Sequence, residues 1–353
     1  MSIKVRPTLA ILRGYPIVML NDGLFGPCHR SGRLTGHDVK GVPTMALEDK
    51  ILVAVDASDR CMETIQHITQ RDPFQKKHLV LYHVFITLPD FYWDIEMEPQ
   101  SRGAVAHVRA WEADKNKEIK EFMEKAQQVL RDAGFPKEAV TVKIKQSEKG
   151  IARDIVEEAK DGYLAVIISR SGEGELPEPF LGTNAAKVIQ HLSFVPVFIA
   201  GKRLPGKNIL VAMDRSEGAM RAVDFVGELM GGHDFKVTLL HVIRNGEQLK
   251  PGASYKPLPK EDIQTVEQKM QGVFDEAKRR LIDYGFKSDH VTHKIITGAS
   301  SLSRAIVQEA EAGEYSPIVI GRRGLSKFQK FFMGSVSNQV IQLGVEQAVW
   351  VVT

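Results

Sequence analysis

Cysteine is scarce in this sequence, and so are the other features that would set the chain apart from ordinary globular proteins. The 353 residues include two cysteines, Cys28 and Cys61. Two are too few for a disulfide framework, and no Cys/His spacing suits a structural zinc ion. Aromatic residues make up 7% of the chain, hydrophobic residues 43% and charged residues 26%, which excludes disordered, collagenous and coiled-coil classes. We therefore expect a folded protein of a reducing compartment, the cytoplasm.

Long hydrophobic runs and an excess of one charge are also missing. The most apolar stretch, residues 9–20, is interrupted by Arg13, Gly14 and Pro16. The sequence thus predicts neither a membrane span nor a signal peptide. Its 47 Lys and Arg residues nearly balance 44 Asp and Glu residues, and a net charge of +3 gives no reason to expect a nucleic-acid surface. We expect neither membrane nor nucleic acid as a partner.

Residues 1–45 differ in character from the rest of the chain. They are basic, contain scattered proline and glycine, and show neither a helical nor a strand period. Met45 stands directly before the first leader into an apolar run. We interpret these residues as an extension that is disordered or belongs to an upstream translation start, and a targeting or docking arm is the alternative.

The remainder of the chain contains two copies of one pattern. Residues 51–58, ILVAVDAS, return as residues 209–216, ILVAMDRS. Residues 82–84, YHV, return at the same spacing as residues 240–242, LHV. Self-similarity of this kind indicates a repeated structural unit. It predicts one domain at residues 46–203 and a second at residues 204–353.

Each copy alternates short apolar runs with helical patterns. In the second copy the runs lie at residues 209–213, 237–243, 291–296, 317–320 and 348–352. Near-continuous apolar runs are typical of strands covered on both faces, and intervening helices give right-handed βαβ units. The sequence predicts an α/β fold of two tandem doubly wound domains, each a five-stranded, mostly parallel sheet with helices on both faces. Ligands of such sheets bind beyond the carboxyl ends of the strands.

A glycine-rich loop follows the fourth strand of the second copy. It reads Gly-x2-Gly-x9-Gly-Ser, with its glycines at positions 321, 324 and 334. Glycines let backbone N–H groups approach an anion, and a helix capped by Ser335 would add positive potential. The loop has no acid and four basic residues: Arg322, Arg323, Lys327 and Lys330. A phosphate site is favoured over the alternative, a plain strand-to-helix connection with a solvated basic face.

With these motifs, the chain resembles the universal stress protein family over residues 46–353. The loop, a first strand ending in Asp and a second strand containing His-Val carry the resemblance. It implies an adenine nucleotide alpha-hydrolase-like fold and ATP binding, with or without Mg²⁺. The implied contacts are adenine near Asp214 and Val242, ribose near Gly321 and Gly324, and phosphates against Gly334, Ser335, Val336 and Ser337, with Arg323 also in the site. The family further implies an intrachain pseudo-dimer through the last strand of each domain, and a homodimer of whole chains stays open.

The first copy departs from this pattern. Ser169 stands in place of the first glycine, and Glu173, Glu175 and Glu178 make the loop acidic. Carboxylates near a triphosphate would repel it. We interpret the first domain as degenerate for ATP, and a nucleoside or a weaker ligand stays open for it.

No catalytic constellation is visible in the sequence. A hydrolase needs a positioned base or a metal-bound water, and the second-copy loop holds neither an acid nor a histidine. We expect His83 and His241 to be hydrogen-bonded core residues and Cys61 to be packed. An aromatic cluster is expected to cover an interface or form a lid: Phe91, Tyr92, Trp93 and Trp111. The favoured function is a non-catalytic, nucleotide-dependent regulator in the stress response; the alternatives are a slow Mg²⁺-dependent ATPase or nucleotidyl-transfer enzyme, and a ligand-free structural module.

Overall fold

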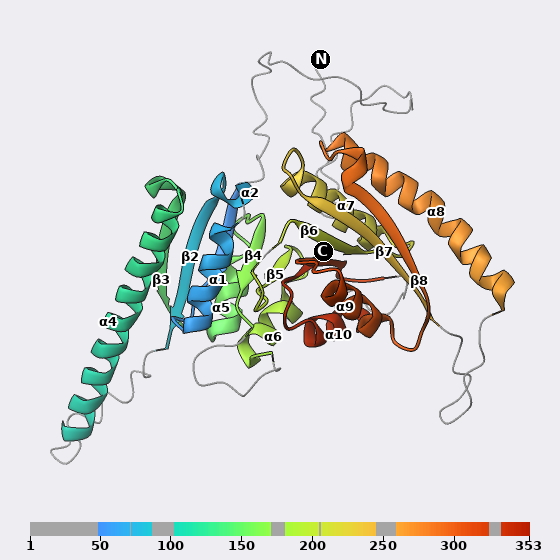
Figure 1. Ribbon diagram of the computed structural model, residues 1–353. Coiled ribbons are helices and arrows are strands. Elements are labelled where there is room, and N and C mark those ends of the chain that lie inside the picture. The colour runs from blue at the N-terminus through green and yellow to red at the C-terminus, as the bar shows by residue number, and fades with distance from the viewer. Residues whose placement is uncertain are drawn as a thin grey trace, which may run out of the picture. The chain divides into compact units, whose positions relative to one another are not determined.

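The computed structural model describes residues 49–70, 72–86, 102–170, 181–204, 206–244, 259–324 and 333–353. The extension expected at residues 1–45 lies outside them, as do Phe91, Tyr92 and Trp93. Strands and helices alternate through two successive domains (Figure 1). The first contains β1 (Lys50–Ala54), α1 (Asp59–Thr69), α2 (Asp72–Gln75), β2 (His78–Phe85), α4 (Arg102–Asp132), β3 (Val140–Gln146), α5 (Ile151–Glu158), β4 (Ala165–Ile168), α6 (Thr183–His191) and β5 (Val197–Ile199).

The second domain repeats this order. It contains β6 (Asn208–Ala212), α7 (Glu217–Met230), β7 (Lys236–Arg244), α8 (Lys260–Asp283), β8 (Val291–Ala299), α9 (Leu302–Ala312), β9 (Ile318–Gly321), α10 (Ser335–Leu343) and β10 (Val349–Val352). Short 3-10 turns at Lys137–Ala139 and Ser288–His290 precede β3 and β8. All five strand positions predicted for this copy are confirmed to within three residues at each end.

The described strands form one continuous sheet in the order β3-β2-β1-β4-β5-β10-β9-β6-β7-β8. Every neighbouring pair is parallel except β5 and β10, which run antiparallel and join the two domains. The predicted α/β class, with two tandem doubly wound halves, is confirmed. In each half the chain changes direction across the sheet between the adjacent strands β1 and β4, or β6 and β9. A crevice forms at the carboxyl ends of such a strand pair.

Both faces of the sheet are covered by helices. Successive residues of β1 belong to opposite layers: Ile51 and Val53 belong to the core layer that also includes residues of α1, α4, α7 and α8, whereas Leu52 belongs to the layer that includes residues of α5, α6, α9 and α10. All three side chains are fully buried. This arrangement explains why the strand sequences are apolar without alternation.

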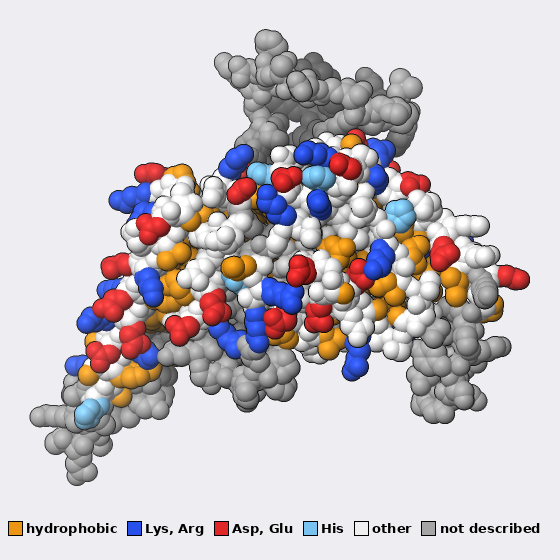
Figure 2. Space-filling view, viewed as in Figure 1, with side chains coloured by type: hydrophobic (Ala, Val, Ile, Leu, Met, Phe, Trp, Pro, Cys, Tyr) orange, Lys and Arg blue, Asp and Glu red, His pale blue; other side chains and the backbone are white. Residues whose placement is uncertain are grey.

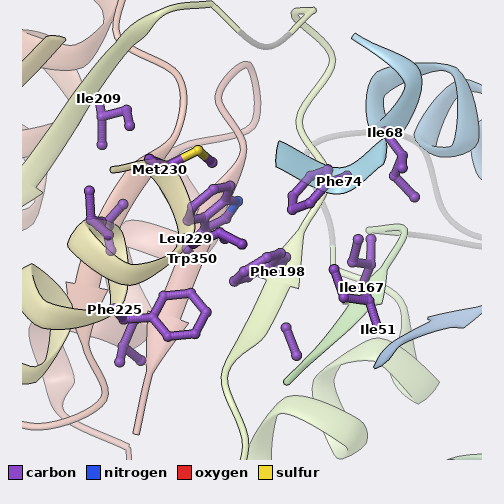
Figure 3. Close-up of a cluster of buried hydrophobic side chains, with 14 of the residues drawn as sticks. Ile51, Ile68, Phe74, Ile167, Phe198, Ile209, Phe225, Leu229, Met230 and Trp350 are labelled. Atoms are coloured by element: carbon purple, nitrogen blue, oxygen red, sulfur yellow. The ribbon is translucent and has the colours of Figure 1, made fainter. Parts of the chain in front are cut away.

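Aromatic side chains fill the junction between the domains (Figure 3). Phe198 of β5 and Trp350 of β10 are register partners, and their rings stack with centroids 4.2 Å apart. Phe225 of α7 meets Phe198 edge-on at 5.7 Å, and Phe74 of α2 lies 6.2 Å from the same ring. Each such pair contributes about 0.5–1.5 kcal/mol beyond the burial of its area. The expected intrachain pair of domains is therefore a packed interface.

The outer helices present charged residues of both signs to solvent. Along α4, at the lower left of Figure 2, basic and acidic side chains alternate. Lys115 lies 2.8 Å from Glu118, and Lys117 lies 3.7 Å from Glu121. Exposed pairs at this spacing add about 0.2–0.5 kcal/mol each to helix stability. The apolar stripe of the same helix faces the sheet and contains Ile119, Met123, Ala126 and Leu130.

Candidate functional site

A cavity of about 380 Å³ lies in the second domain at the carboxyl ends of β6 and β9. Small-molecule sites typically enclose about 300–1,000 Å³. The fold places all nine residues of the predicted second-domain site on the wall of this cavity: Asp214, Val242, Gly321, Arg323, Gly324, Gly334, Ser335, Val336 and Ser337. Residues more than a hundred positions apart in the chain are brought together by the strand order.

One part of the cavity wall is apolar. Val242 comes from β7 and Ile320 from β9, and α9 contributes Leu302 and Ile306. The sequence analysis did not single out the two α9 residues. Their four-residue spacing puts both on the helix face that packs on the sheet, so the helical period could have indicated them. The wall suits a flat apolar group held between a strand edge and a helix.

A histidine held by the backbone also lines the cavity. The Nδ1 atom of His241 lies 2.7 Å from the carbonyl oxygen of Met213. A carbonyl only accepts, so Nδ1 carries the proton. His83 repeats this contact with Val55 at 2.7 Å, and burial lowers the pKa of His83. Both histidines are hydrogen-bonded as expected.

Asp214 connects the end of β6 to the glycine loop. Its Oδ1 atom accepts a hydrogen bond from the Ser216 backbone N–H at 2.9 Å and another from the Ser216 hydroxyl. The Ser216 hydroxyl in turn accepts from the Ala219 N–H at 3.2 Å and caps α7. On the other side, a Cβ added at Gly324 would stand 2.6 Å from Oδ2 of Asp214. The backbone of the loop therefore lies directly against the carboxylate, and a side chain at position 324 would require Asp214 to move.

The N terminus of α10 lies at the cavity without a side-chain cap. Gly334 occupies the N-cap position, and no described side chain there accepts a hydrogen bond from the first turn. The first N–H groups of a helix have no partner within the helix, and its dipole adds positive potential. The Ser337 hydroxyl donates to the carbonyl oxygen of Gly321 at 2.9 Å and ties this turn to β9. This helix end can bind an anion through its backbone.

Two expectations for the loop are wrong. Ser335 was expected to cap α10, but it is the first helical residue and Gly334 is the cap. Arg322 was counted with the basic residues that would face a phosphate. Its side chain is buried and bonds to the first domain instead, because Arg322 and Arg323 leave the strand end in different directions, and Arg323 alone of the two lines the cavity. Lys327 and Lys330 lie outside the described residues.

The first domain has an equivalent but smaller cavity of about 260 Å³. Asp56, His83 and Val84 line it as their counterparts line the second cavity. The end near α6 differs, because Ser169, Asn184 and Ala185 stand where the second domain has Gly321, Val336 and Ser337. The Ser169 hydroxyl lies 3.5 Å from Oδ2 of Asp56. The three glutamates of this loop, Glu173, Glu175 and Glu178, lie outside the described residues.

A close backbone contact distinguishes the second domain from the first. A Cβ added at Gly321 would stand 2.7 Å from the carbonyl carbon of Gly218 at the start of α7. The equivalent positions in the first domain hold Ser169 and Arg60. With side chains at these two positions, the end of β4 cannot come as close to the start of α1 as the end of β9 comes to the start of α7. The space between α1 and β4 instead forms part of a separate cavity of about 430 Å³.

Two further predicted residues can be placed. Cys61 is buried on α1, and burial raises the pKa of its thiol to about 12, so it packs as expected and is unreactive at neutral pH. Trp111 is 55% exposed on α4, where it and Ile86 border a groove beside the first cavity.

The model of the Universal stress protein family matches this chain twice, at residues 48–200 and 206–352. The chain belongs to the universal stress protein family. Family membership supports a role in the stress response, and the two matches agree with the tandem repeat. A curated relative, Universal stress protein YxiE of Bacillus subtilis (strain 168), is 28% identical over 140 residues, which is 38% of this chain and 91% of the relative.

Solved structures resemble this universal stress protein over most of its length. A universal stress protein from Archaeoglobus fulgidus DSM 4304 has a TM-score of 0.57 at 16% identity and covers 87% of this chain and 98% of its own. A functionally unknown protein from Pseudomonas aeruginosa PAO1 has a TM-score of 0.50 at 16% identity and covers 87% of this chain and 94% of its own. Both likenesses show the two-domain fold. No described helix of this universal stress protein has the length and apolar character needed to span a membrane.

Proposed function

We propose that this protein binds one ATP per chain in its second domain and acts as a non-catalytic, nucleotide-dependent regulator in the stress response. The observation that carries the proposal is the uncapped α10 N terminus at one cavity with an apolar wall and a carboxylate. The helix end suits a phosphate chain, the apolar wall suits an adenine, and the carboxylate suits a ribose. Family membership supports the stress-response part of the proposal.

The residues present fit this ligand. The wall of Val242, Leu302 and Ile306 accepts the adenine by apolar contact. The loop at Gly324 lies against Asp214, and we place both at the ribose, whose hydroxyls are donors for a carboxylate, although the family resemblance implies that Asp214 lies near the adenine. The phosphate oxygens accept hydrogen bonds from the backbone N–H groups that follow Gly334, and Arg323 adds positive charge to the cavity wall.

Binding without turnover is favoured by the side chains beside the helix. At the phosphate end the described residues are Gly334, Ser335, Val336 and Ser337. None of these side chains takes a proton from water near neutral pH, and general-base catalysis requires such a group within hydrogen-bond reach of the water. A slow Mg²⁺-dependent enzyme remains the second candidate, and the nucleotide released from the purified protein distinguishes the two.

Matched aspartate substitutions test the site. In the substitution Gly334→Asp, a Cβ would make only ordinary contacts, 3.5 Å from the Arg322 carbonyl oxygen. Aspartate is a favoured N-cap whose carboxylate accepts from the free N–H groups, and it is more stable than glycine at this position by about a few tenths of a kcal/mol. We expect Gly334→Asp to keep or raise the melting temperature and abolish ATP binding in calorimetric titration. The same change at Gly182, the N-cap of α6, should leave ATP affinity unchanged.

Stoichiometry and product identity complete the test. Wild-type protein should bind ATP at one site per chain, and mass spectrometry of nucleotide released after purification should find ATP. ADP or AMP would favour the enzyme, and two sites per chain would contradict the assignment of the first domain as degenerate. Unchanged ATP binding in Gly334→Asp would contradict the assignment of the phosphate site to the N terminus of α10.

A further inference from the structure

The buried arginine of the glycine loop bonds to the other domain. Arg322 directly follows β9, and its side chain is 3% exposed. Its Nη1 atom donates to the carbonyl oxygens of Ile189 and Leu192, both at 2.8 Å, and Nη2 donates to Gln190 at 2.7 Å. These carbonyls end α6 of the first domain. A guanidinium from the second domain thus caps a helix C terminus in the first.

The first domain returns the same contact. Arg170 directly follows β4 and is 5% exposed. It donates to the carbonyl oxygen of Ile341 at 2.6 Å and to that of Gly344, the C-cap of α10. The two arginines occupy equivalent positions in the repeat, so the exchange is reciprocal. Arg170 of the first domain bonds to the C terminus of α10, and Arg322 of the second domain bonds to the C terminus of α6.

The backbones of the same arginines hold the starts of these helices. The Arg322 carbonyl oxygen accepts from the Gly334 N–H at 2.9 Å, and the Arg170 carbonyl oxygen accepts from the Gly182 N–H at 2.7 Å. The hydrogen bonds therefore form a closed ring. It runs from Arg322 through α10 to Arg170, and from Arg170 through α6 back to Arg322. Both helix N termini at the two cavities belong to this ring.

Charge explains why arginine occupies these buried positions. The C terminus of a helix carries a partial negative charge, and its last carbonyls have no partner within the helix. A planar guanidinium supplies several donors in a fixed geometry, which lysine cannot match. Burial lowers the pKa of Arg170 to about 10, which leaves it charged at neutral pH. The carbonyl acceptors offset part of the cost of burying each cation, and the Nε atom of each arginine is buried without a hydrogen-bond partner.

We propose that Arg322 is a positioning residue, and that through it the first domain acts as a scaffold that holds the second domain's phosphate-binding helix end in place. The proposal rests on the proposed ATP site in the second domain. The backbone of Arg322 fixes Gly334, and its side chain is fixed by α6. The domain with the altered loop therefore has a role in nucleotide binding without holding the nucleotide itself.

Two substitutions of Arg322 test the inference in the full-length chain. Arg322→Met keeps the apolar bulk and removes all three hydrogen bonds, and Arg322→Lys keeps the charge and part of the bonding. At a temperature where both are folded, we expect ATP affinity by calorimetric titration to fall about tenfold in Arg322→Met, within the usual range of coupling between sites. Arg322→Lys should recover part of the loss, and it keeps the test usable should the Met variant not fold.

A substitution at the domain junction is the matched control. Phe198→Leu disturbs the ring stack with Trp350, and Phe198 belongs to the core layer opposite the one that contains the buried α6 residues Val188 and Ile189. It should lower the melting temperature and leave ATP affinity within about twofold of wild type, as expected for a site that it does not contact. Hydrogen exchange in nucleotide-free protein gives an independent measurement. The amides of Gly334 and Asn338, which donate to the carbonyl oxygens of Arg322 and Gly334, should exchange faster in Arg322→Met than in wild type, and at the wild-type rate in Phe198→Leu.

Two results would overturn the inference. One is unchanged ATP affinity in both folded Arg322 variants, and the other is an equal loss of affinity in Phe198→Leu, which would assign the effect to domain packing in general. A wild-type protein that binds no ATP would contradict the proposed function instead. The exchange rates of the Gly334 and Asn338 amides would then still decide whether Arg322 positions the start of α10.

Discussion

At the scale of single residues, the two neighbouring arginines that follow β9 have different surroundings. The nine predicted residues line one cavity because strand ends and glycine spacing fix backbone positions. Arg322 and Arg323 are neighbours of one type, yet one bonds to the other domain and the other lines the cavity. The partner of Arg322 is a set of backbone carbonyls, which have no sequence signature. A count of loop charges therefore overstated the positive charge at the site.

One buried carboxylate gives a prediction of pH dependence at this scale. Asp154 is 2% exposed and accepts hydrogen bonds from the Ser147 hydroxyl at 2.9 Å and from the N–H groups of Glu148 and Lys149 at 3.0 and 3.1 Å. Burial alone would raise its pKa, but the hydrogen bonds and the charge of Lys145 outweigh burial, and the pKa lies below its ordinary value. A lowered folded-state pKa stabilises the protein above the unfolded pKa of about 3.9.

The substitution Asp154→Asn should therefore destabilise the protein by about 1–3 kcal/mol at pH 7, as expected for lost bonds to a charged group. The difference from wild type should shrink as the pH falls through the folded-state pKa, because wild-type Asp154 then takes up a proton. Urea denaturation at several pH values measures both effects. Glu157→Gln, an exposed change on the same helix, is the control and should leave stability little altered. A pH-independent difference would contradict the role of charge.

At the scale of elements, the periodicity of hydrophobic residues predicted where the strands of the second copy lie and that helices separate them. On α8, Met270, Ala277 and Leu281 follow the helical period along one face and are buried. The family resemblance implied that the last strands of the two domains, β5 and β10, pair with each other. Their antiparallel direction was not predicted, because no periodicity in either strand distinguishes it from a parallel pair. The hydroxyls of Ser58 and Ser216 cap α1 and α7, whereas the cap expected at Ser335 is wrong, because Gly334 is the N-cap of α10.

Two glycines within helices provide a second prediction. Gly272 lies exposed in α8, and a Cβ there would meet nothing within 4 Å. Gly272→Ala should raise the free energy of unfolding by about 1 kcal/mol, the difference in helix propensity. Gly227 of α7 is the contrasting position, because its Cβ would stand 2.2 Å from the ring of Tyr284. Gly227→Ala should destabilise despite the same gain in propensity. Thermal denaturation of both variants measures these effects. Equal shifts in melting temperature would show that the contact between Gly227 and the ring of Tyr284 is not tight.

At the scale of the whole molecule, the chain divides into residues 1–44 and residues 45–353. The first segment lacks the apolar period needed to bury a face against either core. A protein starting at Met45 should therefore keep the melting temperature and ATP affinity of the full chain, measured by calorimetry. The matched comparison is full-length protein from the same preparation. A large drop in melting temperature would show that the segment is structural.

The covalent connection from β5 to β6 determines how the paired domains respond when the protein is diluted. Backbone N–H groups of Lys202 and Arg203 donate to Val345 and Glu346 at 3.3 and 2.9 Å, so the connection from β5 to β6 lies against the second domain. A short tether of this kind holds two halves at an effective concentration on the order of millimolar or higher. Two separate chains paired through the same strands would come apart as their concentration fell, whereas here the arginine exchange stays complete in a solution that contains a single molecule.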